Sequence, residues 1–119
     1  MGEVREEWQR LRAALEEEAT LSRQSEVVID GLKRRYVRLS PPDQFAVNAL
    51  LGEWLLASDS SRRHDARTLV RTFAIASALP QLCELEQRLM RDSAIHAKHE
   101  LASVRQVIAT LTAAADESS

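Results

Sequence analysis

The sequence is poor in the residues that mark turns and β-sheets. Its 119 residues include only three Gly and three Pro, and aromatic residues make up 4%. Sheet proteins need Gly and Pro at their turns and are enriched in aromatic and β-branched residues along their strands. The scarcity of both kinds of residue predicts an all-α fold.

Cysteine and long apolar runs are also scarce. Cys83 is the single cysteine of the chain, so an internal disulfide is excluded. The densest apolar stretch, 45–57, is interrupted by Asn48, Gly52 and Glu53 and falls short of the ~18 residues that a membrane-spanning helix needs. The chain also opens without the basic and apolar regions of a secretory signal. We therefore expect a cytoplasmic protein that does not contact membranes.

Apolar residues recur at helical spacing along most of the chain, starting with Val4, Trp8, Leu11 and Leu15. Ser40-Pro41-Pro42 marks the clearest boundary, because Ser caps a helix and Pro suits its first position. The pattern predicts five or six helices in antiparallel hairpins. Their expected ranges are 3–21, 25–38, 43–57, a fourth ending near residue 77, a fifth from residue 80 and a sixth after Asp92 and Ser93. Residues 1–112 are expected to form a single helical domain and 113–119 a disordered tail.

The apolar pattern leaves the structure of residues 1–38 open, and it places residues 43–57 in the core. Residues 1–38 fit either a helical hairpin or one long kinked helix, since the pattern weakens without a Gly or Pro to end it. The helix 43–57 carries apolar residues on nearly every face, Phe45 among them, so we expect it to be enclosed by neighbours at the centre of the core.

A weak internal repeat of about 33 residues is present, in which Asp59-Ser60 is echoed by Asp92-Ser93 between two predicted helices. The matching stretches are residues 50–59 and 85–92. On these residues, the segment 45–111 resembles HEAT-like helical repeats, whose hairpins often have an Asp-containing turn and a basic residue near the start of the second helix. The resemblance implies that residues 41–112 form two HEAT-like hairpins of a short α-solenoid, with residues 1–38 as a third hairpin or cap.

Charge is distributed unevenly although the chain as a whole carries a formal net charge of -2. Residues 31–71 hold eight basic and four acidic side chains, whereas the flanking segments are acidic. Within that basic part Arg63, Arg67 and Arg71 recur every four residues and should form a row on one helix face. The row either binds an acidic partner, helped by the basic side chains at positions Arg34, Arg35 and Arg38, or is neutralised within the chain by Asp59, Asp65 or the Glu-rich first helix.

Residues suited to catalysis or metal binding do not form a complete motif. His96, His99 and Glu100 are spaced to share one helix face, but a third ligand from another element is missing, and a solvated face is the simpler interpretation. Cys83 sits among leucines and fits a small apolar role. We therefore expect no catalytic residue, no metal site and no cofactor. Nucleic-acid binding is not expected either, because the chain is acidic overall and lacks aromatic residues among its arginines.

These observations favour a non-enzymatic protein–protein interaction domain that binds an acidic protein surface, such as a bacterial regulatory protein or an immunity-type inhibitor. Two alternatives remain open at this point. The chain could be a self-associating structural module that forms a homodimer through the helix of Trp8, although packing of that helix into its own core is favoured. It could also be a small helical ligand- or metal-binding protein.

Overall fold

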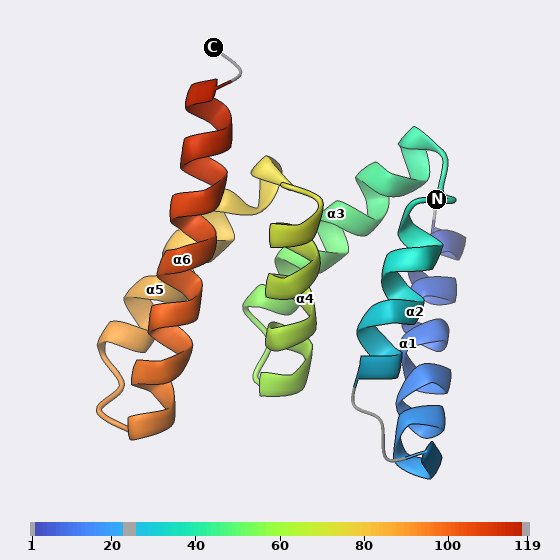
Figure 1. Cartoon of the computed structure of the whole chain (residues 1–119), viewed down its shortest axis with the longest axis horizontal. Helices are drawn as coiled ribbons and strands as arrows, with labels where there is room; N and C mark the ends of the chain where they lie inside the picture. The colour runs from blue at the N-terminus through green and yellow to red at the C-terminus, as the bar shows by residue number, and fades with distance from the viewer. Residues whose placement is uncertain (1, 23–25, 118–119) are drawn as a thin grey trace. The chain divides into compact units, whose positions relative to one another are not determined.

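A computed structural model describes residues 2–22 and 26–117, and in these ranges all regular secondary structure is helical (Figure 1). This confirms the predicted all-α class. The elements are α1 (Gly2–Ser22), α2 (Glu26–Tyr36), α3 (Pro41–Leu55), α4 (Ser60–Thr72), the short 3-10 helix η1 (Ala76–Ala78), α5 (Leu79–Met90) and α6 (Ile95–Glu117). None of the helices in the described ranges is both long enough and apolar enough to span a membrane.

The chain divides into two compact units, the first ending at Leu50 and the second beginning at Leu51, within α3. A single domain over residues 1–112 and a solenoid stacking of the hairpins therefore stay predictions.

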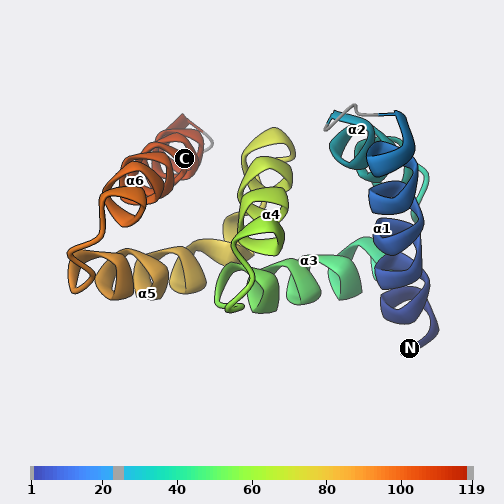
Figure 2. The ribbon, with the colours of Figure 1, turned by 90° about the horizontal axis from the view of Figure 1, so that it is seen from below.

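In the first unit α1 and α2 lie side by side as an antiparallel hairpin (Figures 1 and 2). Of the two alternatives for residues 1–38, the hairpin is thus the one observed, with residues 23–25 outside the described part. The helices approach closely at Gly31, where an added Cβ would lie 2.5 Å from Leu15 Cδ1. Glycine at this position lets the backbone of α2 come near the side chains of α1.

Trp8 and Tyr36 form the aromatic centre of the first unit. Their rings meet edge to face with centroids 6.4 Å apart, and Trp8 is only 1% exposed. The Tyr36 hydroxyl donates to Asn48 Oδ1 at 2.8 Å, and the Gln44 amide donates to the Tyr36 carbonyl at 3.1 Å. These bonds fix the start of α3 against α2. The buried Trp8 shows that α1 packs its apolar face within the first unit.

Helix α3 has one exposed face, although its composition predicted neighbours on several sides. Phe45, Ala49 and Glu53 follow one another at four-residue intervals and are all exposed, Phe45 to 75%. Val47 and Leu51 lie on the opposite side and are fully buried. The helix therefore has a solvent face, and the prediction that Phe45 belongs to the core was wrong.

In the second unit α4 ends at Thr72, five residues before the predicted end. The chain turns at Ala74, which adopts a left-handed conformation with φ 49°. The Ala74 N–H donates to the Arg71 carbonyl at 3.4 Å and the Ile75 N–H to the Val70 carbonyl at 3.0 Å, the two bonds of a Schellman motif. Sequence analysis missed this end because the left-handed position is usually a glycine.

The two Asp-Ser turns of the predicted repeat share one hydrogen-bond pattern. Asp59 Oδ1 accepts from the Ser61 N–H and Asp92 Oδ1 from the Ala94 N–H, both at 2.9 Å. The Asp59 carboxylate thus caps the first turn of α4, whereas the Asp92 carboxylate binds an N–H in the turn just before α6. After the second turn, α6 packs along α5 as a hairpin and continues to Glu117. The tail expected from residue 113 is therefore helical as far as 117, and residues 118–119 lie outside the described part.

Candidate functional site

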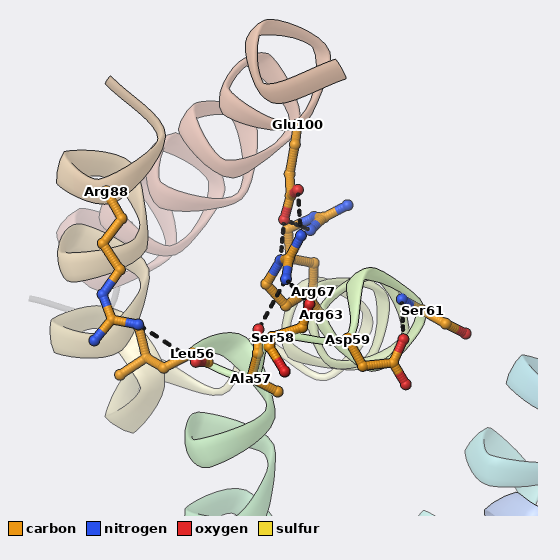
Figure 3. Close-up of polar contacts among 9 residues, drawn as sticks. All are labelled: Leu56, Ala57, Ser58, Asp59, Ser61, Arg63, Arg67, Arg88 and Glu100. Atoms are coloured by element: carbon orange, nitrogen blue, oxygen red, sulfur yellow. Dashed lines mark hydrogen bonds and ion pairs between the residues drawn. The ribbon is translucent and has the colours of Figure 1, made fainter. Parts of the chain in front are cut away.

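The polar centre of the second unit is a cluster of Arg63 and Arg67 from α4 with Glu100 from α6 (Figure 3). Arg63 donates twice to the carboxylate, from Nε to Oε2 at 2.7 Å and from Nη2 to Oε1 at 3.0 Å. Arg67 Nη1 donates to Oε2 at 2.8 Å. One carboxylate therefore holds two guanidiniums, and we call these three residues the Arg63–Arg67–Glu100 cluster.

Arg63 also binds the turn between α3 and α4. Its Nη1 donates to the carbonyls of Ala57 and Ser58 at 2.8 and 2.9 Å (Figure 3). Both residues lie in the turn between Leu55, the last residue of α3, and Ser60, the first of α4. Arg63 thus joins this turn, the first turn of α4 and helix α6 through a single side chain, which indicates a structural role.

The electrostatics of the cluster fix its charge states. Burial alone would raise the pKa of Glu100, but the hydrogen bond from Arg63 and the charges of both guanidiniums outweigh burial, so the pKa lies below its ordinary value. The hydrogen bond to Glu100 raises the pKa of Arg63. Burial lowers the pKa of Arg67, against the opposing effect of Glu100. Two positive charges and one negative charge leave the cluster with a net positive charge.

One donor in the cluster has no acceptor. Arg67 is 8% exposed, and its Nε is buried without a hydrogen-bond partner among the described residues. A buried donor left without a partner costs about 1–3 kcal/mol. Such unsatisfied buried donors are uncommon in folded proteins.

A small pocket lies between α4 and α6. Its volume is about 130 Å³, and it lies beside the Arg63–Arg67–Glu100 cluster. The lining residues, which define what we call the α4–α6 pocket, are His64, Arg67, Thr68, Arg71, Ser103 and Val107. None of these six residues is acidic, whereas two are arginines. The pocket is therefore electropositive.

The structure separates the arginines that the sequence grouped together. Arg63 and Arg67 turn inward onto Glu100, and Arg71 is exposed at the pocket. The row of three free guanidiniums that the spacing predicted is therefore not formed. Glu100 pairs with two of the three arginines, whereas the sequence had offered Asp59, Asp65 or the first helix as the compensating group. Asp59 adds a weaker attraction to Arg63.

The other three predicted arginines lie in the first unit, near the end of α2. Arg34, Arg35 and Arg38 are exposed. Arg34 Nε donates to the Asp30 carbonyl at 3.4 Å, and Arg35 lies 3.8 Å from a carboxylate oxygen of Glu7. Exposed pairs of this kind contribute little to stability, so these guanidiniums are available to a partner.

The candidate metal ligands do not assemble. His96 and His99 are exposed, while Glu100 is held by the two arginines. Within residues 2–22 and 26–117, no three His, Cys, Asp or Glu side chains are placed to hold a metal ion. Cys83 is exposed on α5 rather than packed among the leucines of that helix.

Sequence reasoning missed the roles of Glu100 and Ser103 in this site. Glu100, Ser103 and Val107 are spaced by three and four residues and thus share one face of α6. That face meets α4, but the sequence signal is weak because a polar stripe on a helix usually faces solvent.

Comparison of the chain with known protein families, with curated proteins and with solved structures finds no match. The likeness to HEAT repeats therefore stays an expectation, and function has to be argued from the geometry.

Proposed function

We propose that this chain is a non-enzymatic protein-interaction module that binds an acidic partner protein. The proposed contact surface is the α2–α3 corner, which we define as residues 34–45. A bacterial regulatory protein or an immunity-type inhibitor would use a small helical scaffold in this way.

The observation that carries the proposal is the exposure of large apolar side chains at this corner. Phe45 is 75% exposed and Val37 64% exposed. Single exposed apolar residues are ordinary on protein surfaces, but here two of them occur on a short segment that also carries arginines. Aromatic residues and Arg are enriched at the energetic centres of interfaces.

The positive charge of the α2–α3 corner indicates what kind of partner it would bind. Arg34 and Arg38 are exposed on the same segment, and they belong to the basic part of a chain that is acidic elsewhere. A positive surface attracts an acidic one, speeds the encounter and rejects basic competitors. The corner therefore suits a partner that presents carboxylates around an apolar side chain.

The experiment is a comparison of capture from cell extract with three variants: Phe45→Ser, Arg34→Glu with Arg38→Glu, and the control Arg91→Glu. Arg91 is exposed in the second unit, so its reversal changes charge without touching the corner. We expect the wild type and the control to capture a protein that neither corner variant captures. Its purified form should bind about tenfold more weakly to Phe45→Ser, and binding to the wild type should weaken with added salt.

The proposal fails if the same proteins are captured by all four chains. It also fails if the captured protein is basic at its contact surface, or if the corner variants have lost helicity, in which case the corner is structural.

A further inference from the structure

A hollow of about 430 Å³ lies in the first unit, between the first half of α1 and the end of α2. Its lining residues, which define what we call the α1–α2 hollow, are Val4, Glu7, Trp8, Leu11, Arg35 and Leu39. Four of them are apolar, and the two charged ones have opposite signs. Arg35 and Leu39 lie within residues 34–45, so the hollow adjoins the α2–α3 corner.

The apolar residues of the hollow form a buried floor and partly open walls. Trp8 and Leu39 are buried and make up the floor. Val4 and Leu11 are half-buried, so part of each aliphatic side chain is open to an occupant. An apolar side chain that enters the hollow would therefore contact Val4 and Leu11 first and remove their remaining surface from water.

The charged residues of the hollow are only weakly paired. Arg35 Nη2 lies 3.8 Å from Glu7 Oε2, which is beyond hydrogen-bonding distance, and both side chains are about half exposed. Exposed pairs of this kind contribute little. A carboxylate from outside the chain can therefore replace Glu7 and form the bidentate hydrogen bonds that Arg35 does not make within the chain.

From this arrangement we infer that the α1–α2 hollow receives an apolar side chain of the partner protein, while a carboxylate on the adjacent residue of the partner displaces Glu7 from Arg35. The inference rests on the proposed function and deepens it, because it names the chemistry by which the acidic partner is recognised.

Charge and position both favour a protein segment as the occupant. Arg34, Arg35 and Arg38 are exposed near the end of α2, which attracts an acidic segment and rejects a basic one. The exposed side chains of Val37 and Phe45 follow closely in the chain. A segment that enters the hollow thus finds further apolar contacts at the corner, which a free small molecule would not use.

The test uses short fragments of such a segment as probes. N-acetyl-leucyl-glutamate amide is titrated into the full chain at constant ionic strength, and NMR follows the methyl resonances of Val4 and Leu11. We expect saturable shifts of both. The alanyl-glutamate analogue should bind about tenfold more weakly, because most of the apolar side chain is missing. The leucyl-lysine analogue should bind at least about threefold more weakly, because it cannot pair with Arg35.

Two substitutions of equal charge change separate the role of Glu7 from a general electrostatic effect. Glu7→Gln should tighten binding of the leucyl-glutamate probe about threefold, because it removes the carboxylate that competes for Arg35. The matched control Glu6→Gln changes an exposed residue that does not line the hollow, and it should alter the dissociation constant less than about 1.5-fold. Arg35→Gln should weaken binding about threefold.

The inference is overturned if the leucyl-glutamate probe gives no saturable shift, or if the lysine analogue binds as tightly. It is also overturned if Glu7→Gln and Glu6→Gln have the same effect while the backbone spectra are unchanged. Tighter binding of octanoate than of the peptide probe would assign the hollow to a free apolar acid instead of a protein segment. These outcomes leave capture through Phe45, Arg34 and Arg38 untouched, whereas capture that does not depend on the corner removes the proposed function itself.

Discussion

At the scale of single residues, Glu100 has the largest expected effect on stability. It pairs with two arginines, one of them buried, and removing its charge leaves Arg67 uncompensated. Breaking a buried ion pair from one side costs about 3–5 kcal/mol, so Glu100→Gln should lower the free energy of unfolding by about that amount. Urea unfolding followed by circular dichroism measures it. The matched control is Glu84→Gln, whose ion pair with Arg88 is half exposed and should be worth less than about 0.5 kcal/mol.

The same residue gives stability a pH dependence. Because the pKa of Glu100 is lowered in the folded chain, its contribution is complete above the ordinary carboxyl pKa of about 4.3 and is lost as the pH falls through the lower folded value. We expect the loss of stability between pH 7 and pH 3 to be smaller in Glu100→Gln than in the wild type. Equal losses in the two chains would contradict the assigned pKa direction.

The Arg63–Arg67–Glu100 cluster could be predicted from sequence only in part. The four-residue spacing of Arg63, Arg67 and Arg71 does place Arg63 and Arg67 side by side on one face of α4, and it required a neutralising group. The group is Glu100, 37 positions after Arg63. Spacing within one helix contains no information about which face of a distant helix will meet it.

At the scale of elements, the end of α4 can be tested by changing Ala to Gly at two positions, where the change should have opposite effects on the free energy of unfolding. Ala74 holds a left-handed conformation that favours glycine. Ala74→Gly should therefore raise the free energy of unfolding by about 0.5–1 kcal/mol. Ala109→Gly, at an exposed position inside α6, should lower it by about 1 kcal/mol. If both changes destabilise, the Schellman turn at Ala74 is not formed.

The contact between α1 and α2 provides a second test at this scale. A Cβ at Gly31 would lie 2.5 and 2.6 Å from the two methyl carbons of Leu15. Overpacking costs ~1–3 kcal/mol and helix propensity returns ~1 kcal/mol, so Gly31→Ala should destabilise the chain by about 1 kcal/mol. In a Leu15→Ala background the same change should stabilise it, because the obstructing methyl groups are gone. Identical effects in the two backgrounds would mean that the helices do not approach at this point.

Element boundaries could be predicted from sequence where a specific residue marks them. The Pro41 start of α3 and the Asp59 cap of α4 were predictable, since each has a side chain with a local function. Asp92, also predicted as a cap, instead accepts from the Ala94 N–H in the turn before α6. The end at Thr72 was not predictable, because Ala74 gives no left-handed signal. The exposure of Phe45 was not predictable either, since an apolar side chain does not reveal whether the protein supplies a neighbour for it.

At the scale of the whole molecule, the net charge of -2 hides a division between acidic ends and a basic middle part. The proposed α2–α3 corner draws on this basic part through Arg34 and Arg38. A uniform charge distribution would offer no such contrast, and long-range attraction of acidic ligands would then be weak.

The burial of Trp8 indicates whether the chain associates with a second copy. Trp8 is 1% exposed and packs edge to face on Tyr36 of its own chain, so α1 has its main apolar residue already covered. We expect light scattering to give the 13.4 kDa mass of a monomer. Trp8→Glu should then lower helicity and stability by at least about 3 kcal/mol, because it removes a large core side chain and buries a charge. A wild-type dimer that Trp8→Glu converts into a fully helical monomer would show instead that Trp8 joins two copies of the chain.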